Sequence, residues 1–167
     1  FSGQYHILFP WKNSEKNRVI LFSPSATSSD LINAGTFIFR NNPSDASGGN
    51  VLANLLGKKY KGIAIISENT DYAQVLRKIF IQKLNDLGGQ LSVDEVFSPD
   101  TKDFRPIISK IKNSKAEALV INPQTEQIGG LLIKEARKAK LPMPIYINLV
   151  PTGPKLIEVA GKAADGV

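Results

Sequence analysis

Short apolar runs alternate along the chain with longer segments in which apolar residues recur at helical spacing. Residues 62–67 and residues 117–122 are almost continuously apolar. Runs of this kind are typical of parallel strands that helices cover on both faces. Residues 91–97 alternate between apolar and polar positions, and residues 144–148 form a shorter run, so two further strands are expected.

Helices are expected between these strands. The strand starts, near residues 62, 91, 117 and 144, repeat every roughly 27 residues, which is the size of a strand–helix unit. The pair Gly88-Gly89 is typical of a helix end with a left-handed residue. The alternation predicts the α/β class, with a Rossmann-like parallel sheet that is flanked by helices. The expected helices cover residues 72–87, 104–111, 125–140 and 156–160.

The N-terminal part of the chain is less regular. Residues 18–23 predict a further buried strand, and residues 5–16 predict a helix that a proline interrupts. The turn-rich segment 41–45 is the candidate boundary between two parts of the chain. The elements before it are too few for a domain. We therefore expect residues 1–40 to be the incomplete end of one lobe and residues 41–167 to form a second lobe.

The composition is that of a globular protein. The chain has 167 residues, of which 42% are hydrophobic and 22% are charged. The net charge of +6 comes from scattered lysines and arginines that are not interleaved with aromatic residues. We therefore expect a solvated basic surface and no nucleic-acid partner. No apolar run reaches the ~18 residues that a membrane span needs.

The residue types that carry most enzyme chemistry are scarce. The chain has no cysteine, which excludes disulfides and thiolate metal sites, and His6 is its single histidine. No glycine-rich nucleotide loop, nucleophile elbow or pair of carboxylates follows a predicted strand. The sequence therefore predicts no cofactor, no metal site and no catalytic residue.

The segments that follow the predicted strands are the candidate binding residues, because ligands of open α/β sheets bind beyond the carboxyl ends of the strands. The first of these segments is rich in serine. It either caps a helix or forms a cradle of hydroxyl and backbone N–H groups for a carboxylate or phosphate. Tyr72 belongs either to the core or to the wall of a ligand pocket. The segments are residues 23–30, 68–72, 122–125 and 148–151, which taken together are rich in hydroxyl and amide side chains.

Several segments, taken in order, resemble a known family. Residues 23–31 (Ser-Pro-Ser-Ala-Thr-Ser-Ser-Asp-Leu) resemble a loop of type I periplasmic solute-binding proteins. The similarity is closest to the branched-chain amino-acid-binding, Leu/Ile/Val-type receptors of ABC importers. Residues 70–72 (Thr-Asp-Tyr) resemble the helix start of that family. The further segments that follow its pattern are residues 37–40, 43–45, 87–89, 103–104, 107–108 and 159–161.

The resemblance implies a two-lobe receptor. Such a protein binds a small molecule in the cleft between two Rossmann-like lobes and presents it to the membrane permease of an ABC importer, without catalysis. It also implies a periplasmic or otherwise extracytoplasmic location after removal of a signal segment. Because the chain begins with Phe1 and not with Met, we expect a fragment of such a receptor. Apolar surface exposed where lobe one should continue would favour self-association of the fragment.

The resemblance also implies ligand contacts in lobe one. Ser2 resembles the serine that begins a helix and binds the ligand carboxylate. Ser25, Ala26 and Thr27 match the loop that holds the carboxylate and ammonium groups through its backbone and a hydroxyl.

In lobe two, Tyr72 matches an aromatic ligand contact. Gln124 and Thr125 match a loop that is often aromatic in the family, so this position departs from the pattern. The implied acid for the ligand ammonium would lie near Asn148 to Val150, where this sequence has no acid. Asn148 is therefore the contact residue that we expect there. A buried ammonium group without a partner is costly, so an amino acid and another small polar or carboxylate ligand both stay open.

The leading prediction is thus a solute-binding receptor or a fragment of one. A ligand-sensing regulatory or receptor domain of the same fold is an alternative, because a fold does not fix a function. An enzyme on a doubly wound α/β sheet is a further alternative. Neighbouring genes for a permease and an ATPase would separate the receptor from the sensor.

Overall fold

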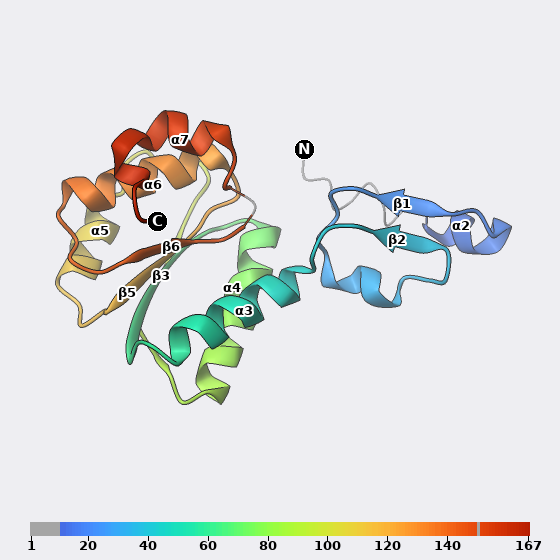
Figure 1. Ribbon diagram of the computed structural model, residues 1–167, viewed down its shortest axis with the longest axis horizontal. Helices are drawn as coiled ribbons and strands as arrows, with labels where there is room; N and C mark the ends of the chain where they lie inside the picture. Colours follow the sequence, from blue (N-terminus) through green and yellow to red (C-terminus); the bar gives the residue numbers. More distant parts are fainter. Residues whose placement is uncertain (1–10, 150) are drawn as a thin grey trace. The chain divides into compact units, whose positions relative to one another are not determined.

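The computed structural model describes residues 11–149 and 151–167, and a four-stranded parallel sheet forms the centre of its C-terminal part (Figure 1). The strand order is β4-β3-β5-β6, so β3 and β5 lie inside the sheet and β4 and β6 at its two edges. All neighbouring strands are parallel, which confirms the predicted α/β class. The strands are β3 (Gly62–Glu68), β4 (Gln90–Phe97), β5 (Ala118–Asn122) and β6 (Ile145–Ile147).

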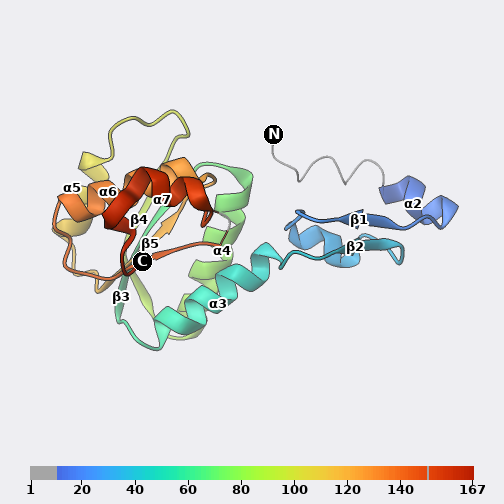
Figure 2. The same cartoon turned by 45° about the horizontal axis from the view of Figure 1, so that its top comes forward.

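Helices cover both faces of this sheet (Figure 2). Ile63 and Ile65 of β3 pack against α3 and α4, while Ala64 and Ile66 pack against α5, α6 and α7. Successive side chains of a strand point to opposite faces, so a strand covered on both faces is apolar throughout. The helices are α3 (Asp45–Gly57), α4 (Asp71–Asp86), α5 (Arg105–Lys112), α6 (Glu126–Lys138) and α7 (Pro154–Ala160), and a 3₁₀ turn (Gly161–Ala164) follows α7.

The end of α4 confirms the expected left-handed glycine. Gly88 has φ +75°, and the N–H of Gly89 donates to the carbonyl of Leu84 at 3.0 Å. This hydrogen bond satisfies one of the carbonyls that a helix end leaves open.

The described residues divide into two compact units, the N-terminal unit (Phe1–Gly48) and the C-terminal unit (Gly49–Val167). The N-terminal unit contains α2 (Trp11–Asn17), β1 (Leu21–Ser23), a 3₁₀ turn (Ser29–Asn33) and β2 (Ile38–Arg40). Its two strands are parallel to each other. The assignment of residues 1–40 and 41–167 to two lobes stays a prediction.

The buried strand predicted over residues 18–23 is wrong in two respects. Only Leu21–Ser23 is strand, because Arg18 has φ +53° and ends the preceding segment in a turn. Phe22 is 56% exposed, since the described residues of this unit provide only a two-stranded sheet with one uncovered face. The helix predicted over residues 5–16 is present from Trp11 onward, and the rest of it lies outside the described residues.

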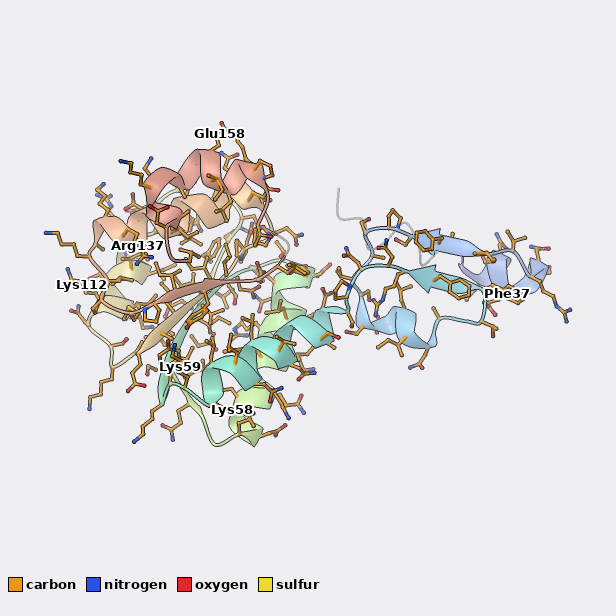
Figure 3. All side chains as sticks on the ribbon, in the orientation of Figure 1. Phe37, Lys58, Lys59, Lys112, Arg137 and Glu158 are labelled. Atoms are coloured by element: carbon orange, nitrogen blue, oxygen red, sulfur yellow. The ribbon has the colours of Figure 1, made fainter. Side chains whose placement is uncertain are left out.

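The basic residues lie on several different elements, as Figure 3 shows for Lys112 and Arg137. Lys112 Nζ donates to the carbonyl of Ala139 at 2.9 Å, and Arg137 Nη2 donates to the carbonyl of Asp165 at 3.0 Å. Cations are favourable at such chain and helix ends. In the described part of the chain, no helix is long and apolar enough to cross a membrane.

Candidate functional site

Three strands of the C-terminal unit bring polar residues to one edge of the sheet, which we call the carboxyl edge: Ser67 and Glu68 end β3, Asn122 ends β5, and Asn148 follows β6. The strand register places Ser67 opposite Asn122 and Ile121 opposite Ile147. Helices α4 and α6 begin directly after β3 and β5, so their N-termini lie at the same edge (Figure 1). The carboxyl edge is therefore where a ligand of this sheet is expected.

A buried chain of side-chain hydrogen bonds connects the three strand ends. Asn122 Nδ2 donates to Ser67 Oγ at 3.1 Å and to the carbonyl of Ala73 at 2.8 Å. Asn148 Nδ2 donates to Asn122 Oδ1 at 2.6 Å and to the carbonyl of Pro123 at 3.2 Å. Ser67, Asn122 and Asn148 are all buried. This amide chain fixes the start of α4 and the ends of β3, β5 and β6 relative to one another.

One atom of the amide chain has no partner. Asn148 Oδ1 is buried and accepts no hydrogen bond from any described residue. The orientation of the amide is determined, because both atoms that face Asn148 Nδ2 are oxygen acceptors. A buried acceptor that stays unpaired is costly, so the oxygen needs a partner such as a water molecule, an ion or a ligand group.

Glu68 is a buried acid at the same edge. Its side chain and backbone together are 4% exposed, and its Oε2 accepts from the N–H of Gln124 at 2.7 Å. Gln74 Nε2 donates to the carbonyl of Glu68 at 2.9 Å. Among the described residues, no basic side chain forms an ion pair with it, but the positive ends of the α4 and α6 dipoles lie nearby.

Sequence reasoning missed this role of Glu68. An acid just before a helix is usually interpreted as a favourable charge at the helix N-terminus, and Glu68 is among the candidate binding residues only as part of the segment 68–72. The signal that could have found it is its place directly after the fully buried run of β3, the central strand.

Of the predicted contacts in this unit, Tyr72, Gln124, Thr125 and Asn148 lie in the segments that follow these strands. Tyr72 is buried and packs with Ala73 and Leu76. Thr125 Oγ1 accepts from the N–H of Ile128 at 3.3 Å and so caps α6. The hydroxyl of Thr125 is thus already engaged with its own helix, whereas Asn148 retains a free acceptor.

The serine-rich loop of the N-terminal unit is ordered by its own polar contacts. Ser23 Oγ accepts from the N–H of Ala26 at 3.0 Å, and the carbonyl of Thr27 accepts from the N–H of Asp45 at 2.9 Å. Ala26 is buried, and Ser25 is exposed. The N-cap in this segment is Ser28, whose side chain accepts from the N–H of Asp30.

Asp45 is a buried acid beside this loop. Burial raises its pKa, while a hydrogen bond with Thr27 and the charge of Arg40 oppose that shift. The predicted contact Ser2 lies outside the described residues. The described residues contain no group of three or more His, Cys, Asp or Glu side chains that could hold a metal ion.

Comparison with known proteins decides the family. The family model described as a periplasmic binding protein matches residues 12–167. The chain belongs to the periplasmic binding protein family. This confirms the resemblance that the sequence motifs indicated.

Individual relatives agree with this assignment. The chain is 26% identical to a Leucine-, isoleucine-, valine-, threonine-, and alanine-binding protein of Pseudomonas aeruginosa, over 92% of this chain and 42% of the relative. A leucine-binding protein of Thermotoga maritima matches with a TM-score of 0.74 and 25% identity, over 92% of this chain and 44% of that structure. A branched-chain amino acid transporter substrate-binding protein of Streptococcus pneumoniae, solved with isoleucine, matches with a TM-score of 0.78, 25% identity and the same coverage. The chain thus spans less than half the length of these relatives.

Proposed function

We propose that the chain is part of an extracytoplasmic receptor of an ABC importer, and that its carboxyl edge binds a small polar ligand without catalysis. The observation that carries this proposal is the buried amide chain with its unpartnered acceptor, Asn148 Oδ1. It lies where open α/β sheets bind ligands. Membership of the family supports a binding function, and relatives are named for the leucine, isoleucine or valine that they bind.

The ligand class that we propose is an amino acid or a small carboxylate. In the N-terminal unit, the exposed hydroxyl of Ser25 and the backbone around Ala26 provide groups of the kind that bind a carboxylate. In the C-terminal unit, Asn148 and the N-termini of α4 and α6 provide an acceptor and backbone donors. The position where the family resemblance implies an acid carries no acid here.

The partners follow from the same assignment. A membrane permease of an ABC importer is the proposed protein partner, and export from the cytoplasm is the proposed location. Self-association of this chain is also proposed, because Phe22 and Phe39 are exposed apolar side chains in one two-stranded sheet.

Nuclear magnetic resonance tests the binding proposal at the residues concerned. We expect leucine, isoleucine or valine to shift the side-chain amide signals of Asn122 and Asn148 and the backbone signal of Gln124. The exposed amide of Asn85, in the last turn of α4, is the internal control and should not move. If neither these amino acids nor small carboxylates shift signals at the carboxyl edge, the proposed function is wrong.

A further inference from the structure

The strands of the C-terminal unit begin at the edge of the sheet opposite the carboxyl edge, and we call it the amino edge. Because neighbouring strands are parallel, the segments that lead into them meet there. Lysines that are scattered in the sequence come together in these segments, and all of them are exposed. They are Lys58, Lys59 and Lys61 before β3, Lys115 before β5 and Lys140 before β6, of which Figure 3 labels the first two.

The charge of the amino edge is not balanced by acids. The segments that lead into the four strands are residues 58–61, 87–89, 113–117 and 139–144, and Glu117 is the one acid in them. The segments between each strand and the next helix, at the carboxyl edge, contain Asp100, Asp103 and a single lysine, Lys102. Positive charge is therefore concentrated at one edge of this sheet.

Stabilisation of helix ends does not account for all five lysines. The C-termini of α3, α5 and α6 lie at the amino edge, but a cation is favoured there only within about the last turn. Lys61 directly precedes β3, and Lys115 lies three residues after the end of α5. Among the described residues, neither side chain forms an ion pair. Their charges are therefore available to a partner outside the chain.

Hydrogen bonds between the segments hold the amino edge in one arrangement. The backbone N–H of Lys61 donates to Glu117 Oε2 at 2.7 Å and joins the segment before β3 to the segment before β5. The hydroxyl oxygens of Tyr60 and Tyr146 are 2.9 Å apart and join the first of these segments to β6. A surface that is already ordered loses less conformational entropy when it binds.

The residue types at the amino edge favour a charged plane over a protein partner. The centres of protein interfaces are depleted in lysine and enriched in aromatic residues and arginine. The four segments contain no arginine, and Leu87, which is 36% exposed, is their one exposed large hydrophobic side chain. An ammonium group is a compact, strongly hydrated point charge. Each such group near an anionic membrane surface adds to the attraction, over about one Debye length.

We propose that the amino edge is an electrostatic docking surface for a membrane that carries anionic phospholipids. The lysines attract the headgroup phosphates, and no side chain inserts into the bilayer. Docking through this edge leaves the opposite, carboxyl edge of the same unit free of lipid. The proposal therefore goes beyond ligand binding and does not depend on it.

Flotation with lipid vesicles tests this surface on the full 167-residue chain. One set of vesicles is pure phosphatidylcholine, and the other is an equal mixture of phosphatidylcholine and phosphatidylglycerol. We expect the chain to float with the anionic vesicles and not with the neutral ones. Raising the salt from about 0.1 M to about 1 M should weaken binding at least about tenfold, because the Debye length falls from about 10 Å to about 3 Å.

Removal of three charges locates the surface. The combined variant Lys58→Gln, Lys61→Gln and Lys115→Gln should weaken binding to the anionic vesicles at least about tenfold, because each lysine near the lipid contributes to the attraction. All three side chains are exposed, so the fold should be kept, which circular dichroism checks. The salt series on the unmodified chain decides independently of the variant.

A matched variant controls for net charge. Lys78→Gln, Lys102→Gln and Lys155→Gln remove the same number of exposed charges from the middle of α4, the segment after β4 and the start of α7. This variant should weaken binding by less than about threefold, because these lysines lie away from the amino edge.

Three outcomes would overturn the assignment. The first is the absence of flotation with the anionic vesicles at about 0.1 M salt. The second is an equal loss of binding in the two triple variants, which would show that binding follows net charge and not the amino edge. The third is binding to soluble poly-glutamate without binding to the vesicles, which would indicate an acidic protein as the partner.

Discussion

Glu68 Oε2 accepts a hydrogen bond from the backbone N–H of Gln124 at 2.7 Å, and this bond joins the end of β3 to the loop after β5. The two residues are 56 positions apart in the sequence. A buried carboxylate thus holds the loop that leads into α6. The loop includes two of the predicted ligand contacts, Gln124 and Thr125.

Replacing this acid should destabilise the C-terminal unit. Glu68→Ala removes the acceptor of the Gln124 N–H, and a hydrogen bond to a charged group contributes about 1.5–3 kcal/mol. Glu68→Gln keeps an acceptor of similar shape and should cost less of the free energy of unfolding. Urea denaturation of both variants measures the difference, and equal losses would show that the hydrogen bond to Gln124 does not stabilise the loop.

The amide chain should also be sensitive to truncation. Asn122→Ala removes the donor to Ser67 Oγ and the carbonyl of Ala73, and it leaves Asn148 Nδ2 with one acceptor fewer. We expect the free energy of unfolding to fall by about 2–3 kcal/mol, since several buried polar groups then lose their partners. Asn85→Ala, an exposed amide in α4, is the control and should change it by less than about 0.5 kcal/mol. A loss for Asn122→Ala as small as the control would contradict the role of the chain.

The sheet was predictable because its environment is simple. Residues 62–67 and 117–122 are apolar throughout, and the structure covers β3 and β5 with helices on both faces. The same apolar pattern over residues 18–23 led to the prediction of a buried strand, which is wrong because the strand is shorter and Phe22 is exposed. A run of apolar residues indicates that a strand can be buried on both faces. It does not show which other segment, if any, packs against each face. In the N-terminal unit, the described residues leave Phe22 exposed.

The candidate site was predictable only at the level of residue types. The sequence places the amide of Gln124 and the hydroxyl of Thr125 after β5 and the amide of Asn148 after β6. Which polar atom has no hydrogen-bond partner depends on the strand register and on the side-chain rotamers. Together they place Asn148 Nδ2 against Asn122 Oδ1 and leave Asn148 Oδ1 without a partner among the described residues. Glu68 was missed because its partner, Gln124, comes from a distant segment.

The glycine at the end of α4 should resist substitution for backbone reasons alone. Gly88 has φ +75°, and a Cβ atom added there would meet no atom within 4 Å. Gly88→Ala should therefore cost about 1 kcal/mol of the free energy of unfolding, through the left-handed conformation and not through a clash. Gly88→Asn should cost less, because asparagine tolerates this conformation better. Thermal unfolding of the two variants gives the ranking, and an alanine variant as stable as the parent would contradict it.

We expect the pKa of the Asp103 carboxyl group to be unusually low. Its carboxylate accepts from the guanidinium of Arg105, and this hydrogen bond lowers the pKa of Asp103 from 3.8 to about 2. Because the folded-state pKa is depressed, the interaction is fully present above pH 3.8 and is lost as the pH falls through about 2. Arg105→Gln should move the pKa of Asp103 back toward 3.8, as measured by the carboxyl carbon shift. Lys102→Ala is the control and should leave it unchanged.

The exposed pair Phe22 and Phe39 should make the chain associate with itself. They are register partners on β1 and β2, and they are 56% and 49% exposed. Burying one such side chain against a second copy is favourable by about 1.5–3 kcal/mol. Light scattering at increasing concentration should therefore show a mass above that of the monomer.

The double variant Phe22→Ser and Phe39→Ser should weaken the association by about tenfold or more. Ile157→Ser, an exposed apolar residue of α7, is the control and should not weaken it. A monomer at every concentration would show that this surface does not bind a second copy.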